Sequence, residues 1–114
     1  MNDLLSKKCV PCEGGVSALD LSQIHKYQKK VDGWNVKKNE KEIYFLEKKF
    51  TFKNFISSQK FINKVGEISE KENHHPDISF GWGYATIEIT THAIEGLSEN
   101  DFILAAKIDQ VFNV

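Results

Sequence analysis

Residues 78–89 read Ile-Ser-Phe-Gly-Trp-Gly-Tyr-Ala-Thr-Ile-Glu-Ile, and their pattern predicts a β-hairpin on which the rest of the predicted fold is built. Apolar residues alternate with polar or small ones on both sides of Gly83-Tyr84, where the apolar parity changes. A two-residue hairpin loop with glycine first, as a type II′ turn requires, explains that change. The resulting register gives three cross-strand pairs on one buried face. These pairs are Trp82 with Ala85, Phe80 with Ile87, and Ile78 with Ile89.

Three helices are expected around this hairpin. Asp20 and a glutamine three residues later form a capping box, which predicts a helix over residues 20–31. A stripe of apolar residues predicts a second helix over residues 53–70. Ser98 and Asp101 repeat the capping-box spacing and predict the start of a third helix.

Two further strands precede the second helix. Residues 34–37 and 42–50 have strand-like composition and flank a polar turn. The elements therefore follow the order α-β-β-α-β-β-α, with short links between paired strands. We predict an α+β fold in which helices cover a four-stranded antiparallel sheet.

The strand over residues 42–50 is apolar on both faces. Its apolar side chains are Ile43 and Phe45 on one face, and Tyr44, Leu46 and Phe50 on the other. A strand of this kind is expected to pack against helices on one face and to meet a partner chain on the other.

The composition is that of one globular domain. The chain has 114 residues and a mass of 13.1 kDa, with 40% hydrophobic and 27% charged residues. Sixteen acidic residues nearly balance fifteen basic ones, and every basic residue is lysine, so arginine-based recognition of nucleic acid is not expected. No apolar run approaches the ~20 residues that span a bilayer, and residues 1–8 lack the apolar region of a secretory signal. We therefore expect a cytoplasmic protein with no membrane or nucleic-acid partner.

Cys9 and Cys12 form a C-x-x-C pair in a glycine-rich lead. This spacing occurs in redox motifs and in half of a zinc knuckle. A closed zinc site needs four ligands, however, and the remaining candidates are histidines far along the chain. We expect residues 1–18 to be a semi-ordered lead in a reducing compartment, followed by a single domain over residues 19–114.

Three of the four histidines are predicted to gather at one rim of the sheet. Extending the hairpin register outward sets His75 opposite His92, with their Cβ atoms roughly 5 Å apart. Pro76 ends regular pairing and keeps the residue before it extended, so His74 points to a different side. Glu70 lies one helical turn before His74. Because imidazole exchanges protons near neutral pH, this cluster predicts general acid-base catalysis.

A metal site and a purely structural role are the alternatives for these histidines. A three-histidine zinc site would need neighbouring side chains that point apart to reach one ion, and neither H-x-H nor H-E-x-x-H spacing occurs. His74 and His75 could instead only stabilise the negative end of a helix, which gives His92 no role. We expect no metal ion, and we expect His25 to be a solvated residue among the lysines of the first helix.

Six short motifs combine into a specific pattern. They are EKENHHPD at residues 70–77, TH at 91–92, GLSEND at 96–101, DGW at 32–34, FTFK at 50–53 and LAAKID at 104–109. This combination resembles the pterin-4a-carbinolamine dehydratase family over nearly everything from Leu19 to Asp109. The cysteine-containing lead is also similar to that of bacterial members.

The resemblance implies dehydration of 4a-hydroxytetrahydropterin to quinonoid dihydropterin, which recycles the cofactor of aromatic amino acid hydroxylases. It implies that His74 and His92 carry out the acid-base work while His75 holds the pterin ring. It further implies that Glu70 supports the His74 side and that Trp34 forms an apolar wall nearby. No metal or organic cofactor is expected, because the pterin is the substrate.

Asn73 and Asp101 complete the residues expected at the site. Mammalian relatives tend to carry aspartate where this chain has Asn73, which removes a charge beside the histidines. Asp101 matches a frequent family position, but its N3 place in the third helix favours a capping role.

The resemblance also bears on partners. It implies a small-molecule pterin substrate, assembly as a homodimer or homotetramer, and an aromatic amino acid hydroxylase as a pathway partner. Family relatives in animals also bind a homeodomain transcription factor through a helical surface. A protein-binding module is therefore the alternative function.

Overall fold

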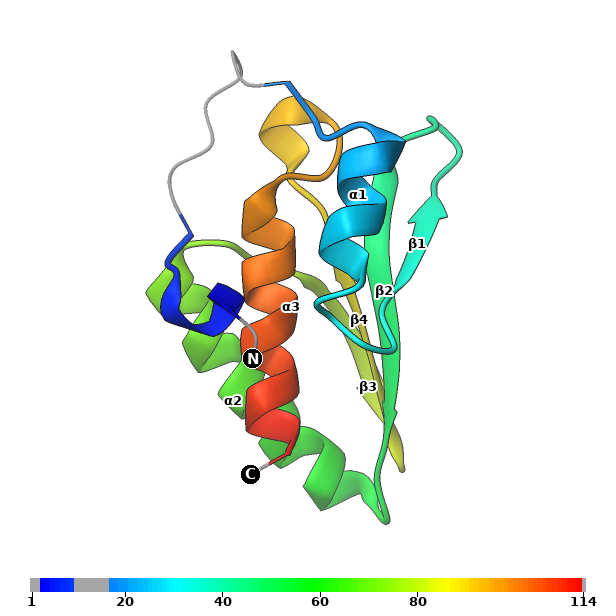
Figure 1. Ribbon diagram of the computed structural model, residues 1–114. Coiled ribbons are helices and arrows are strands. Elements are labelled where there is room, and N and C mark those ends of the chain that lie inside the picture. Colours follow the sequence, from blue (N-terminus) through cyan, green and yellow to red (C-terminus); the bar gives the residue numbers. More distant parts are fainter. Residues whose placement is uncertain (1–2, 10–16, 114) are drawn as a thin grey trace.

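The computed structural model describes residues 3–9 and 17–113 and confirms the predicted α+β fold. Its elements are the 3₁₀ helix η1 (Asp3–Ser6), α1 (Leu21–Gln28), β1 (Asn35–Lys38), β2 (Tyr44–Thr51), α2 (Phe55–Glu72), β3 (Asp77–Gly81), β4 (Tyr84–Ile89), the 3₁₀ helix η2 (His92–Ile94) and α3 (Glu99–Phe112). Figure 1 shows the three α-helices on one face of the four-stranded sheet. The order of α-helices and strands is the one predicted.

Helices α1 and α3 begin at the capping residues that the sequence indicates. At α1, the Asp20 side chain accepts a hydrogen bond from the Gln23 backbone at 2.9 Å, and the Gln23 side chain accepts one from the Asp20 backbone at 3.0 Å. Ser98 and Asp101 form the same box at α3. The side chain of Asn54 caps α2. These caps fix where each helix starts, and at α3 they also fix where the first turn presents its side chains.

The sheet has the strand order β1-β2-β4-β3, and all neighbouring strands are antiparallel. The predicted hairpin register is wrong by two residues. The observed pairs include Gly81 with Tyr84, Phe80 with Ala85, and Ile78 with Ile87. The loop is Trp82-Gly83, because Gly83 supplies a positive φ of 81° at the second loop position. A shift of two residues keeps each strand residue on its face, but it moves Trp82 out of the buried set, where its side chain is 71% exposed.

The core lies between the helices and the inner face of the sheet. Leu46 and Phe50 of β2 are 0% and 2% exposed and pack toward the helices together with Ile87 of β4. Most residues in the first two turns of α3 are buried, so this helix is central to the core. On the opposite face of β2 lies the half-buried Phe45, and the half-buried Ile43 directly precedes the strand. Contact of this face with a partner chain stays a prediction.

The described part of the lead packs against the rest of the chain. The 3₁₀ helix η1 lies against α3 and places Leu4 in the core at 0% exposure. Lys7 forms an ion pair with Glu99 at the start of α3, with a nitrogen-to-oxygen distance of 2.8 Å. The division of the chain at residue 18 stays a prediction, and Cys12 lies outside the described residues.

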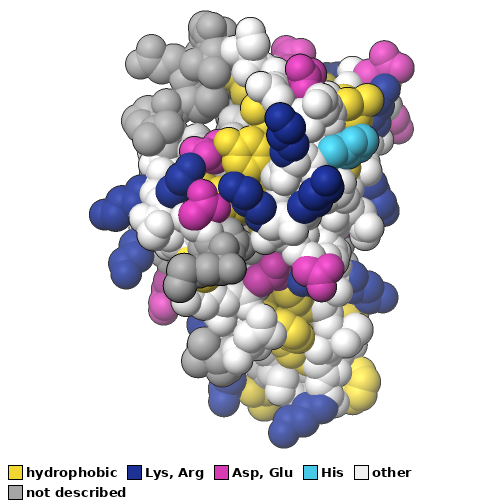
Figure 2. Space-filling view, in the orientation of Figure 1, with side chains coloured by type: hydrophobic (Ala, Val, Ile, Leu, Met, Phe, Trp, Pro, Cys, Tyr) yellow, Lys and Arg dark blue, Asp and Glu magenta, His cyan; other side chains and the backbone are white. Residues whose placement is uncertain are grey.

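Charges of both signs are mixed on the surface that carries the helices. Figure 2 shows lysines and carboxylates interspersed over this face. Within residues 3–9 and 17–113, no helix combines the length and the apolar character needed to cross a membrane.

Two glycine substitutions are expected to change stability in opposite directions. Gly83→Ala should lower the free energy of unfolding by about 1–2 kcal/mol, because alanine is strained at positive φ. Its Cβ would also lie 3.2 Å from the carbonyl oxygen of Phe52. Gly66→Ala should raise the free energy of unfolding by about 1 kcal/mol, since alanine favours a helix interior. Its Cβ would meet nothing within 4 Å in the described chain. Urea unfolding measures both, and a stabilising Gly83→Ala would contradict the observed loop.

Candidate active site

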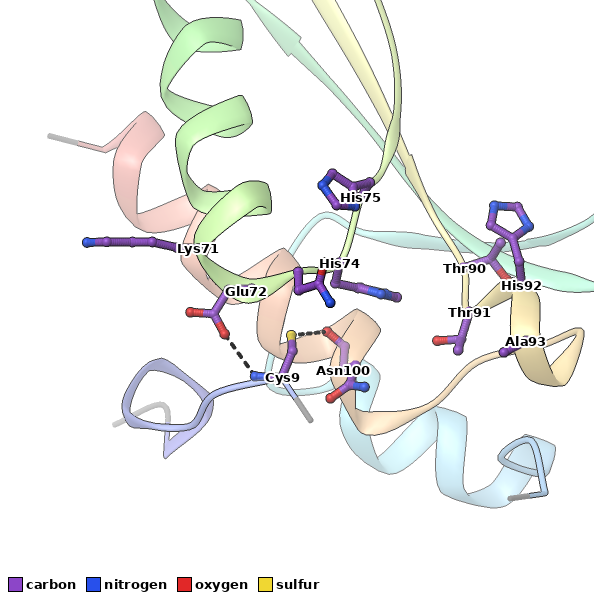
Figure 3. Close-up of a pocket in the computed structure, with 11 residues that line it drawn as sticks. Cys9, Lys71, Glu72, His74, His75, Thr90, Thr91, His92, Ala93 and Asn100 are labelled. Atoms are coloured by element: carbon purple, nitrogen blue, oxygen red, sulfur yellow. Dashed lines mark hydrogen bonds between the residues drawn. The ribbon is translucent and has the colours of Figure 1, made fainter. Parts of the chain in front are cut away.

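A cavity of about 570 Å³ opens between the end of α2, the loop after β4 and the start of α3. His74, His75 and His92 all line it, so the structure brings the three imidazoles to one cavity. Figure 3 shows His74 pointing toward the loop that carries Thr91 and His92. The candidate site therefore has imidazoles on two sides.

The end of α2 decides where the adjacent histidines point. Asn73 adopts the left-handed conformation with φ 52° and ψ 40°, and this residue type tolerates that conformation better than most. The backbone N–H of His74 then donates to the carbonyl of Ser69 at 3.1 Å. The chain reverses here, so His74 turns toward α3 while His75 turns outward. Asn73 lines the cavity and also ends α2, and an uncharged amide side chain is compatible with both roles.

Asp101 holds His74 in place. Its side chain is 0% exposed, and its Oδ1 lies 2.7 Å from Nε2 of His74. Its Oδ2 accepts hydrogen bonds from the Ser98 backbone and from the Thr91 hydroxyl, both at 2.8 Å. The sequence favoured capping as the role of Asp101. The structure shows that the same carboxylate caps α3 and orients the imidazole.

Glu70 pairs with a different histidine from the one predicted. Its Oε2 bonds to Nε2 of His75, not to His74. The side chains of His75 and Glu70 are 55% and 79% exposed, so solvent screens this pair. The reversal of the chain at Asn73 explains this pairing. It places His74 beside the buried Asp101 and leaves His75 beside the last turn of α2, which carries Glu70.

His92 reaches the cavity through the loop after β4, not through the sheet. The prediction that His75 and His92 lie directly opposite each other on paired strands is wrong, because the pairing of β3 with β4 ends at Asp77 and Glu88. Instead, the backbone N–H of Thr91 donates to Gly96 at 2.9 Å, and η2 begins at His92. Since the Thr91 hydroxyl also binds Asp101, the loop carrying His92 is tied to the support of His74.

Trp34 lies in the core and does not line the cavity. Its side chain is 2% exposed, and its indole N–H donates to Oδ2 of Asp109 at 3.0 Å. Lys48 donates to the other oxygen of that carboxylate at 2.8 Å. The expectation of an apolar wall beside the histidines therefore does not match the place of Trp34.

The sequence does not predict several of the residues that line the cavity. They are Cys9, Lys71, Glu72, Thr90, Thr91, Ala93 and Asn100. Thr90, Thr91 and Ala93 could have been found from their places beside His92. Cys9 and Asn100 come from distant parts of the chain, and no local pattern relates them to the histidines.

The arrangement suits proton transfer. A carboxylate that bonds one nitrogen of an imidazole orients the ring and leaves the other nitrogen to exchange a proton with a ligand. Asp101 and Glu70 supply such partners to His74 and His75. In the part of the chain that the structure describes, no three His, Cys, Asp or Glu side chains are grouped as a metal ion would require.

The family model for pterin 4 alpha carbinolamine dehydratase matches residues 17–111. The chain belongs to this family. A relative from Rubrobacter xylanophilus is 44% identical over 111 residues, covering 97% of this chain and all of the relative. One from Halorhodospira halophila is 49% identical over 106 residues, covering 93% of this chain and 94% of the relative. Both carry names that propose pterin-4-alpha-carbinolamine dehydratase without establishing it.

Solved structures support the dehydratase-family fold. A protein from Brucella melitensis described as a transcriptional coactivator/pterin dehydratase aligns with a TM-score of 0.74 and 24% identity, covering 83% of this chain and 98% of that one. A pterin dehydratase-like protein described as a RuBisCO assembly factor aligns with a TM-score of 0.59 and 24% identity, covering 69% and 88%. At this identity, the likeness shows the fold alone.

Replacing Asp101 by asparagine is expected to lower the free energy of unfolding by about 2–4 kcal/mol, because a buried site built for a carboxylate then faces an amide. The matched control is Asp20→Asn, the same change at an exposed N-cap, where asparagine caps as well as aspartate and the change should stay within about 0.5 kcal/mol. Urea unfolding followed by circular dichroism measures both. Equal decreases in the free energy of unfolding for Asp101→Asn and Asp20→Asn would contradict a special role for the buried carboxylate.

Proposed function

We propose that this protein is a 4a-hydroxytetrahydrobiopterin dehydratase, a lyase that acts on a carbon–oxygen bond. The observation that carries the proposal is the placement of His74, held by Asp101, and of His92 around the same cavity. Membership of the pterin-4a-carbinolamine dehydratase family supports it. The cavity volume of about 570 Å³ is also sufficient for a small heteroaromatic ligand.

The reaction needs one proton donor and one proton acceptor. The 4a-hydroxyl leaves with a proton from an acid as water, the C4a–O bond breaks, and a base takes the proton from N5 as the C4a–N5 double bond forms. We assign these two transfers to His74, which lies in the segment after α2, and to His92, which begins η2. His75 holds the ring and positions the hydroxyl, and Glu70 orients His75. The elimination is neither a redox step nor a hydrolysis, so it calls for no metal ion or organic cofactor.

The cellular role proposed is the recycling of tetrahydrobiopterin after aromatic amino acid hydroxylation. In that role the partner is a small-molecule pterin released by a hydroxylase of the same pathway. The protein would act in the cytoplasm, without a membrane or nucleic-acid partner.

We propose that the protein assembles as a homodimer or homotetramer. Three large apolar side chains near the β3 edge and the start of α2 are exposed: Phe55 by 43%, Ile56 by 60% and Trp82 by 71%. Apolar side chains grouped in this way favour contact with another protein surface. An exposed edge strand such as β3 also favours pairing with a second chain.

Light scattering after gel filtration should give a mass two or four times the 13.1 kDa of one chain. Ile56→Glu should reduce that mass, because a carboxylate buried in an apolar interface is costly. Lys26→Glu on α1 is the control at an exposed site away from these residues and should leave the mass unchanged. A wild-type monomer would contradict the proposed assembly.

Replacement of the histidines tests catalysis directly. His74→Ala and His92→Ala should each lower kcat by about 10²–10⁴-fold, the usual contribution of general acid-base catalysis. The measurement is a stopped-flow assay with chemically generated carbinolamine. His25→Ala removes an exposed imidazole from α1 and should leave kcat unchanged. Circular dichroism establishes that each variant remains folded.

The same variants separate the dehydratase from the alternative, a protein-binding module. The names of the two structural neighbours, a coactivator/dehydratase and an assembly factor, motivate that alternative. A binding module would tolerate loss of the histidines and respond to changes in its apolar surface. A wild-type kcat for dehydration in both His74→Ala and His92→Ala would therefore contradict the assignment of proton transfer to these two histidines.

A further inference from the structure

The N-terminal segment, residues 3–9, contributes to the wall of the histidine cavity. Cys9 lines this cavity although it lies more than sixty positions before His74 in the chain. Figure 3 shows Cys9 below the end of α2, between Glu72 and Asn100. Part of the cavity wall therefore comes from a segment outside the sheet and the three α-helices.

Glu72 fastens this segment to the domain. Its Oε1 accepts a hydrogen bond from the backbone N–H of Cys9 at 2.8 Å, and its Oε2 accepts one from Lys107 of α3 at 2.8 Å. The carboxylate is only 9% exposed. Burial alone would raise the pKa of Glu72, but the hydrogen bonds from Lys107 and Cys9 outweigh burial and lower it. Glu72 is therefore ionised at neutral pH and can act as a charged acceptor for the Cys9 backbone.

The segment has further anchors at a distance from Glu72. Leu4 is buried in the core, and Lys7 binds the carboxylate of Glu99 at 2.8 Å. The Tyr27 hydroxyl donates to the same Glu99 oxygen at 2.8 Å. Lys7 and Leu4 therefore hold the segment against α3 and the core, and Tyr27 of α1 shares the Glu99 carboxylate that binds Lys7. The course of the segment toward the cavity is thus defined before it reaches Cys9.

The Cys9 side chain gives this wall an uncharged surface. Its sulfur lies 3.5 Å from the carbonyl oxygen of Asn100. Burial, followed by the nearby charge of Glu72, raises the pKa of the Cys9 thiol to about 12, so the thiol is neutral at physiological pH. A neutral, polarisable sulfur packs well against an aromatic ring.

We propose that Glu72 is a positioning residue that fixes residues 3–9 as one wall of the pterin-binding cavity, and that Cys9 is the contact surface which this wall offers to the ring. The inference rests on the proposed function, because a pterin is the occupant. Glu72 acts on binding and not on proton transfer, since His74 and His75 bond to other carboxylates.

Added bulk at the wall gives the sharpest test. Cys9→Phe should raise both KM for the carbinolamine and Kd for 7,8-dihydrobiopterin by at least about tenfold, because the new ring takes space that the pterin needs. Its kcat should stay within about twofold of wild type, since the histidines and their carboxylates are untouched. Lys8→Phe places the same ring on the exposed neighbour and should leave both constants unchanged. Kd is measured by isothermal titration calorimetry.

A second pair of variants tests the fastening by Glu72. Glu72→Ala removes the acceptor of the Cys9 backbone and should raise KM and Kd about fivefold, with kcat again within about twofold. Lys107→Met removes the ion pair but keeps the carboxyl oxygen that accepts from Cys9, so it should lower the melting temperature and raise KM by less than Glu72→Ala does. A purely structural role for Glu72 would lower the melting temperature in both variants and leave KM and Kd unchanged.

The outcomes separate this inference from the proposed function. Wild-type KM and Kd in both Cys9→Phe and Glu72→Ala, in a protein that dehydrates the carbinolamine, would overturn the inference and leave the function standing. A loss of kcat with unchanged KM in Glu72→Ala would also overturn it. A wild-type protein that neither binds 7,8-dihydrobiopterin nor dehydrates the carbinolamine would overturn both.

Discussion

The structure depends on the burial of one carboxylate, that of Asp101. Its two oxygens accept hydrogen bonds from the Ser98 backbone and the Thr91 hydroxyl and pair with the His74 ring. A buried carboxylate without such partners costs several kcal/mol, so these groups must meet when the chain folds. They belong to the start of α3, the loop after β4 and the segment after α2. The contacts that satisfy the carboxylate therefore also assemble the cavity.

His74 is held more rigidly than His75, because the carboxylate that binds His74 is buried and the one that binds His75 is exposed to solvent. His74 is 13% exposed and bonds to the fully buried Asp101. His75 and Glu70 are both largely exposed, and solvent weakens a pair of this kind. His74 is consequently fixed by the fold, whereas His75 can adjust to a ligand. This difference agrees with the proposed roles, in which His74 transfers a proton and His75 holds the ring.

Periodicity and capping residues predict the helices and strands because each depends on residues close together in the chain. The hairpin register cannot be predicted in this way. Alternation fixes the face of a side chain but not its partner, and a glycine such as Gly83 can occupy either position of a two-residue loop. At the site, helical spacing predicts that Glu70 lies near both His74 and His75, but it does not determine which of them Glu70 binds, and the structure shows that it is His75. The core position of Trp34 depends on Asp109, which lies 75 residues further along the chain.

The backbone strain of the chain is concentrated beside the cavity. Three non-glycine residues among those described have positive φ, and two of them flank the site: Asn73 precedes His74, and Glu95 ends the turn of η2 that begins at His92. The left-handed conformation costs roughly 1–2 kcal/mol for an L-residue, although asparagine tolerates it better than glutamate. At η2, the Thr91–Gly96 bridge holds the turn closed. Relaxing either turn would redirect one of the two imidazoles assigned to proton transfer. The amide at position 73 therefore has a conformational role that requires no charge beside the histidines.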